Sequence, residues 1–61
     1  MTLKEIEKEA RRRVDEDGCA RIVYLTTGAK LGICLLDDWV NRPILDRGVS
    51  IVWPDKIESL I

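Results

Sequence analysis

Residues 36–46 read Leu-Asp-Asp-Trp-Val-Asn-Arg-Pro-Ile-Leu-Asp, which places a polar turn between two apolar segments. The acidic and amide side chains between Asp37 and Asn41 favour a turn, because they readily hydrogen-bond to nearby backbone groups. Ile44 and Leu45 then begin the next apolar segment. Since Pro43 has no N–H to donate to a sheet, this segment predicts a shortened third strand.

The segments on both sides of this turn predict further short antiparallel strands. Apolar and β-branched residues favour strands over residues 19–26, 30–36 and 49–53, and residues 57–61 favour a closing strand or a helical turn. Residues 26–29 predict a hairpin turn in which Gly28 supplies a positive φ. About five short strands in so short a chain favour a strongly bent SH3-like small barrel over a two-sheet sandwich.

One helix is predicted ahead of the strands, over about residues 3–16. Thr2 and Glu5 fit a capping box, and Gly18 is a natural C-terminal stop. The basic run Arg11–Arg13 predicts a solvated helix face with local ion pairs rather than a phosphate-binding patch. Residues 1–61 are therefore predicted to form a single domain, with the barrel over about residues 19–61. The apolar residues at helical spacing are Leu3, Ile6, Ala10 and Val14.

The amino-acid composition argues against several classes of function. The chain has 61 residues, a net charge of −1 and no histidine. With only Cys19 and Cys34 as thiols, and with no base to activate Ser50, we expect no metal site, no cofactor and no enzymatic activity. No apolar stretch is long enough to span a membrane, and no signal peptide is recognisable. We therefore expect a cytoplasmic protein with reduced thiols.

The order of these segments resembles the Sm-like family of RNA-binding proteins, which includes the bacterial Hfq type. Residues 25–28 (Leu-Thr-Thr-Gly) are similar to the start of the family's first motif, residues 36–41 to its acidic turn, and residues 44–46 to the strand that follows. Residues 49–57 are similar to the second motif, although Trp53-Pro54 replaces the family's Arg-Gly pair. The resemblance implies a helix before a five-stranded bent barrel, assembly into homo-oligomeric rings by edge pairing, and binding of single-stranded RNA.

In the Sm-like interpretation, the central turn forms a nucleic-acid site. The resemblance implies that Asp37 orients the loop and that Asn41 hydrogen-bonds a base. Trp39 would offer an aromatic platform for a base, with packing in the core as the equal alternative. Arg42 and Lys56 would supply positive charge.

A second interpretation makes the chain a protein-interaction or assembly module with no nucleic-acid role. The slight excess of acidic residues and the replaced Arg-Gly pair favour it. The partner would be further copies of the chain or another protein, and a small regulatory or inhibitor protein is a third interpretation. The contact surface would then be built from four apolar residues near the C-terminus, which are Trp53, Ile57, Leu60 and Ile61.

Overall fold

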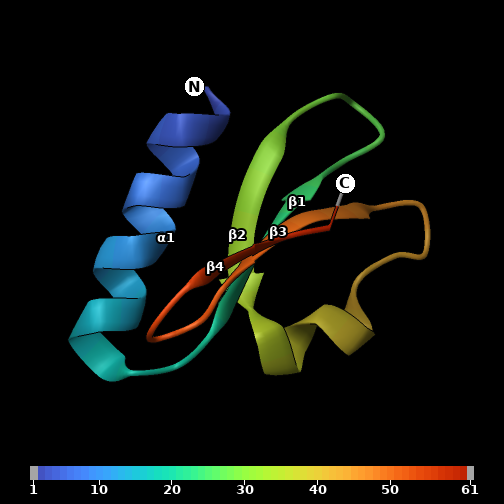
Figure 1. Cartoon of the computed structure of the whole chain (residues 1–61). Coiled ribbons are helices and arrows are strands. Elements are labelled where there is room, and N and C mark those ends of the chain that lie inside the picture. Colours follow the sequence, from blue (N-terminus) through green and yellow to red (C-terminus); the bar gives the residue numbers. More distant parts are fainter. Residues whose placement is uncertain (1, 61) are drawn as a thin grey trace.

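The computed structural model describes residues 2–60 and shows one α-helix followed by a small antiparallel sheet (Figure 1). A 3-10 helix, η1, lies between the second and the third strand. The expectation of a mainly β fold behind an N-terminal helix is therefore confirmed. The elements are α1 (Leu3–Asp17), β1 (Arg21–Leu25), β2 (Leu31–Leu35), η1 (Leu36–Asn41), β3 (Arg47–Val52) and β4 (Ile57–Ser59).

Helix α1 has the caps that the sequence predicts. The Glu5 N–H donates to Thr2 Oγ1 (3.3 Å) and the Thr2 N–H donates to Glu5 Oε1 (3.2 Å), which completes the capping box. At the other end Gly18 is left-handed (φ 70°), and its N–H donates to the carbonyl of Val14 (2.6 Å). The helix extends to Asp17, just beyond its predicted end.

The four strands form one antiparallel sheet in the order β2-β1-β3-β4. On β1, Val23 lies opposite Ile33 of β2, and Ile22 lies opposite Ile51 of β3. The register of the β1–β3 pair shifts between Val23 and Tyr24, an irregularity that increases the local twist. The pairing of β4 with β3 confirms that the last predicted segment forms a strand rather than a helical turn.

The predicted third strand through Ile44 and Leu45 is wrong. These residues lie in the connection between η1 and β3, where the Asp46 N–H donates to the carbonyl of Pro43 (3.0 Å). The Arg42 side chain pairs with the Asp46 carboxylate four positions later, which holds the chain in a turn and prevents an extended strand. The described residues therefore contain four strands.

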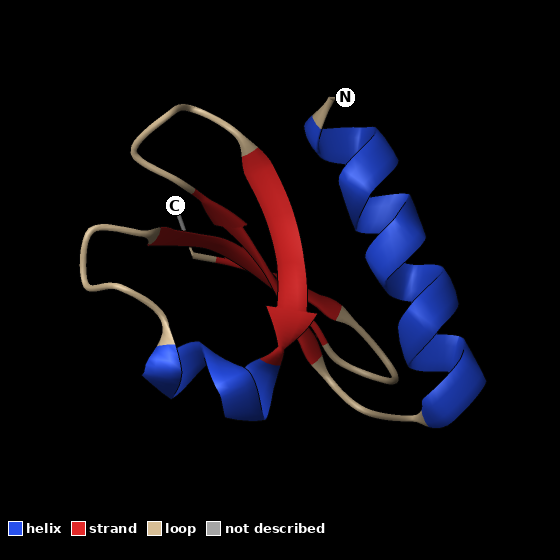
Figure 2. Cartoon of the chain, turned by 180° about the vertical axis from the view of Figure 1, so that it is seen from behind, coloured by secondary structure: helices blue, strands red, loops and turns tan. Residues whose placement is uncertain are grey.

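The hydrophobic core lies between α1 and one face of the sheet. Ala10 and Val14 of the helix meet Val23 of β1 and Val52 of β3, and all four side chains are 0% exposed. Figure 2 shows α1 on this face, while η1 and the connection after it lie on the other side of the sheet. On that side η1 packs against β1 and β2.

The hairpin turn between β1 and β2 uses a different residue from the one predicted. Ala29, and not Gly28, has the positive φ (59°). The Ala29 N–H donates to the carbonyl of Thr26 (3.0 Å), and Thr26 Oγ1 accepts from the Lys30 N–H (3.3 Å). The Thr26 side chain thus stabilises a turn in which alanine takes the left-handed conformation.

An ion pair at the C-terminal end of α1 makes stability depend on pH. Asp17 Oδ2 accepts from Arg21 Nη2 (2.6 Å), and Asp17 Oδ1 accepts from the Cys19 N–H (3.0 Å). The hydrogen bond from Arg21 is the main reason that the pKa of Asp17 is lowered from 3.8 to about 2, and the hydrogen bond from the Cys19 N–H adds to this effect. Because the folded pKa is depressed, this stabilisation is complete above the unfolded pKa and is lost as the pH falls through the folded one.

We therefore expect Asp17→Asn to lower the urea midpoint at about pH 6 and to lower it much less near pH 2, where the folded carboxyl is about half protonated. Unfolding followed by circular dichroism at both pH values measures this difference. Asp55→Asn, in the exposed turn before β4, is the matched control and should have no effect at either pH. A drop of equal size at both pH values would contradict the role of the Asp17 charge.

Candidate functional site

The second face of the sheet is organised around Tyr24, which projects from β1 and is 9% exposed. The Trp39 ring of η1 lies 5.7 Å from the Tyr24 ring, centroid to centroid, at an interplanar angle of 40°. The guanidinium carbon of Arg42 lies 4.3 Å from the centroid of the same Tyr24 ring. The Tyr24 ring therefore contacts the Trp39 ring and the Arg42 guanidinium at the same time.

Two glycines make room for this cluster, because Tyr24 lies opposite Gly32 on β2 and opposite Gly48 on β3. A Cβ atom on Gly32 would lie 2.6 Å from Tyr24 Cζ, which is closer than such atoms can approach. A Cβ atom on Gly48 would lie 2.9 Å from Leu60 Cδ1 and 3.1 Å from Ile22 Cδ1. The side chains of this face therefore pack directly against the backbone of the neighbouring strands.

Arg42 and Asp46 fix the two ends of residues 42–46, which we call the anchored loop. Asp46 Oδ2 accepts from Arg42 Nη2 (2.9 Å) and Nε (3.2 Å), and the Asp46 side chain is only 7% exposed. The hydrogen bond to Asp46 raises the pKa of Arg42. The Arg42 N–H also donates to the carbonyl of Trp39 (3.0 Å). Since the Arg42 guanidinium covers Tyr24 as well, the loop is attached to the sheet.

The anchored loop and the end of η1 expose large apolar side chains to solvent. Ile44 is 98% exposed, Val40 is 82% exposed and Leu45 is 69% exposed. We call these three residues the apolar tip. A single exposed apolar residue is ordinary, but three within residues 40–45 make this segment a candidate contact surface.

The structure brings together only some of the residues that the sequence assigns to a nucleic-acid site. Asp37 and Asn41 are exposed on η1, and Trp39 of the same element is half-buried. Arg42 lies beside Trp39 on the Tyr24 ring. Lys56 is exposed in the turn before β4, whereas η1 follows β2 at the opposite edge of the sheet.

The residues that the sequence assigns to an oligomer interface lie on β4 and beside it. Ile57 is 47% exposed and Leu60 is 44% exposed. Trp53 is half-buried, and its carbonyl accepts from Arg11 Nη2 (2.5 Å), which ties the turn before β4 to α1. Ile61 lies outside the described residues.

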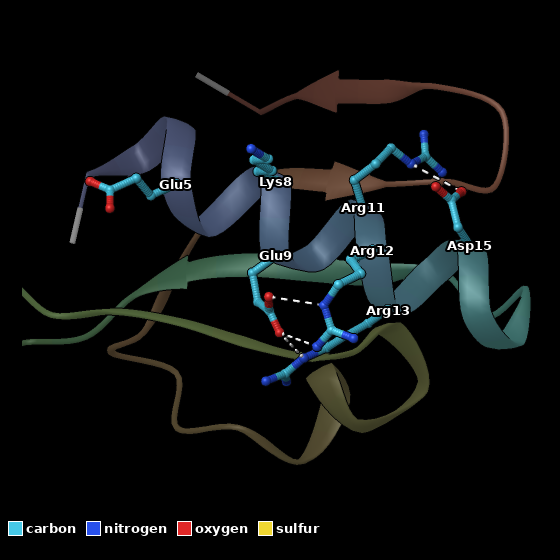
Figure 3. Close-up of a pocket in the computed structure, with 7 residues that line it drawn as sticks. All are labelled: Glu5, Lys8, Glu9, Arg11, Arg12, Arg13 and Asp15. Carbon is cyan, nitrogen blue, oxygen red and sulfur yellow. Dashed lines mark hydrogen bonds and ion pairs between the residues drawn. The ribbon is translucent and has the colours of Figure 1, made fainter.

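An open hollow on the surface of α1 is surrounded by charged side chains (Figure 3). Glu9 accepts hydrogen bonds from Arg12 and Arg13. These bonds, with that from Arg12 the stronger cause, lower the pKa of Glu9 to about 2. Arg11 Nε lies 3.4 Å from Asp15 Oδ1. These ion pairs confirm the prediction for the basic run, whose charges are largely compensated within the helix. The lining residues are Glu5, Lys8, Glu9, Arg11, Arg12, Arg13 and Asp15.

Sequence reasoning missed the role of Tyr24 and the exposure of Ile44. One local signal was available, because Arg42 and Asp46 flank Pro43 with opposite charges four positions apart. The position of Tyr24 between two glycines has no such signal, since it depends on the register of three strands.

Comparisons with protein families, with curated proteins and with solved structures found no match. No helix within residues 2–60 has the length and apolar character needed to cross a membrane. Across the part of the chain that the structure describes, His, Cys, Asp and Glu side chains form no group of three or more that could hold a metal ion.

Proposed function

We propose that this chain is a non-enzymatic protein-interaction module that binds another protein through the apolar tip. The observation that carries the proposal is the 98% exposure of Ile44 on a loop whose ends are fixed by Arg42 and Asp46. A side chain so exposed adds almost nothing to the core of its own domain. A loop that is already held in place loses little conformational freedom on binding, which favours affinity.

The partner would offer an apolar pocket with basic side chains at its rim. The apolar tip would fill the pocket, while Asp37 and Asp38, exposed at the start of η1, would face the rim. Neither carboxylate has an ion-pair partner within residues 2–60. A small regulatory or inhibitor protein would occupy a site on its target in this way.

The lack of an enzymatic role is part of the proposal. Burial raises the pKa of the Cys34 thiol, which disfavours the nucleophilic thiolate. Ser50 is 2% exposed beneath the helix, and no described group hydrogen-bonds to its hydroxyl. We place the protein in the cytoplasm, where Cys19 and Cys34 would remain the free thiols that they are in the structure.

Binding of single-stranded RNA by an Sm-like ring is a second proposal, and the five-stranded barrel belongs with it. The exposure of Asp37 and Asn41 favours it, because loop side chains of this kind read unpaired bases. Two contacts weigh against it. The Trp39 ring already packs on Tyr24, and the Arg42 guanidinium already pairs with Asp46, so a base and a phosphate would have to compete with both.

The experiment that tests the proposal introduces a photo-crosslinking amino acid at position 44 of the full chain, in its native host. We expect an adduct with a protein that resists nuclease and survives high salt, since an apolar contact is not screened. Val40→Ser with Leu45→Ser should abolish this adduct. An adduct that nuclease degrades and that weakens steeply with salt would overturn the proposal in favour of RNA.

The matched control carries the same crosslinker at position 4, where Lys4 is exposed on α1. The adduct should be absent there. The same adduct from positions 4 and 44, or no adduct from position 44, would also count against the apolar tip as the contact surface.

A further inference from the structure

Strand β2 is an uncovered edge of the sheet. The strand order places it at one end, and Figure 2 shows it in front of the other strands with no described segment across it. Its sequence from Leu31 to Leu35 is Leu-Gly-Ile-Cys-Leu, which contains neither a charge nor a proline. Edge strands of this kind lack the features that normally prevent pairing with another chain.

The hydrogen-bond pattern shows which backbone groups are free on this edge. The Thr26 N–H donates to the Lys30 carbonyl (2.9 Å), and the Leu36 N–H donates to the Ala20 carbonyl (3.1 Å), so these bonds extend the β1–β2 ladder at both ends. Antiparallel ladders alternate, which directs the backbone groups of residues 32 and 34 towards β1. The N–H groups of residues 31, 33 and 35 therefore point away from β1, and so do the C=O groups of residues 31 and 33, on a side of β2 that has no neighbouring strand within residues 2–60. The Leu35 carbonyl is the N-cap carbonyl of η1 and accepts the first hydrogen bond of that helix.

The other edge of the sheet is better protected. β4 has three residues, and the charged Glu58 lies in its middle. Antiparallel pairing of β4 with a second β4 about its centre would place two Glu58 carboxylates opposite each other, which is destabilising. Pairing through β2 brings no like charges together within the strand.

We propose that two copies of this chain pair through β2, antiparallel, about a two-fold axis at Ile33. The two four-stranded sheets would then join into one continuous sheet. Leu31 would lie opposite Leu35 of the second copy, and Ile33 opposite Ile33. The two Ile33 residues would exchange two backbone hydrogen bonds, and each Leu35 N–H would donate to the Leu31 carbonyl of the other copy. Such a two-fold contact closes on itself, so it yields a dimer and no longer assembly.

Charge complementarity identifies the occupant of this edge as a second copy in the antiparallel direction. The exposed Lys30 lies just before β2, and the exposed Asp37 and Asp38 lie just after it. Antiparallel pairing brings Lys30 of each copy towards the two aspartates of the other. Parallel pairing would instead place Lys30 beside Lys30 of the second copy, and the two aspartates beside the same two aspartates, so that like charges meet. The contact does not involve the apolar tip, so the dimer can form whether or not the tip binds another protein. It does engage Asp37 and Asp38, which the proposed function places at the rim of the partner's pocket.

Leu35→Pro tests the pairing sharply. Leu35 has φ −61° and ψ 143°, values that proline adopts without strain, and its N–H points away from β1. Sedimentation equilibrium of the wild-type chain should show a mass that rises with concentration from 7.0 kDa to twice that value. Leu35→Pro should stay at the monomer mass with an unchanged circular dichroism spectrum. Ile57→Lys, on β4, is the matched control and should dimerise as the wild type does.

Charge reversal provides a second test that does not depend on the fold of the proline variant. Lys30→Glu should weaken the dimer by about tenfold, because each of two symmetric charge contacts contributes a factor of a few. Adding Asp37→Lys and Asp38→Lys to Lys30→Glu should restore it. A wild-type chain that stays monomeric at every concentration, a mass plateau above the dimer, or a dimer indifferent to Leu35→Pro and to the charge reversal would each overturn the proposal.

Discussion

Tyr24→Ala is expected to remove most of the stability of this protein. Replacing a buried aromatic side chain by alanine costs about 3–5 kcal/mol. A domain of this length is stabilised by about 3–9 kcal/mol in total. Loss of the Tyr24 ring would also leave Trp39 and Arg42 without the surface on which they lie. Urea unfolding, followed by circular dichroism and by tryptophan fluorescence, measures the loss.

Tyr24→Phe is the matched variant, because it keeps the ring and removes only the hydroxyl. We expect it to cost less than about 1 kcal/mol and to leave the contacts of Trp39 and Arg42 in place. A Tyr24→Ala variant as stable as Tyr24→Phe would show that this ring does not hold the second face of the sheet together.

Gly32→Ala is expected to cost about 1–3 kcal/mol, although it adds a single methyl group. The new Cβ would lie 2.6 Å from Tyr24 Cζ and 2.7 Å from Tyr24 Oη, so the ring must move. Trp39 and Arg42 lie on the same ring and limit where it can go. Near-ultraviolet circular dichroism, which reports on aromatic packing, should change together with the unfolding midpoint.

Gly28→Ala is the control for this substitution. A Cβ atom there would meet only Thr26 Oγ1, at 3.8 Å, and Gly28 does not have a positive φ. We expect its effect to stay within about 0.5 kcal/mol. Equal effects of the two alanines would contradict the close approach of the Tyr24 ring to β2.

The sequence predicts the parts of the fold whose causes are local. The capping box at Thr2 and Glu5 and the stop at Gly18 define α1 almost to the residue. β1 and β2 follow from their apolar patterns, and so does most of β3. The predicted strand at Ile44 and Leu45 failed because the apolar pattern of a short run does not reveal whether a neighbouring strand will pair with it.

The candidate site was only partly predictable for the same reason. The sequence draws attention to Trp39 and Arg42, but their shared contact is Tyr24, which lies far from both along the chain. That contact exists because the register places Tyr24 between Gly32 and Gly48. Pairing register is a property of the folded sheet, and single residue types do not encode it.

The most direct test of the central claim is the free energy of unfolding of the double variant Ile44→Ser with Leu45→Ser. If the apolar tip serves binding and the fold does not need it, the variant should unfold within about 0.5 kcal/mol of the wild type. Leu45→Ser alone should behave in the same way. A loss of about 2 kcal/mol or more, as expected for side chains that pack in a core, would contradict the account.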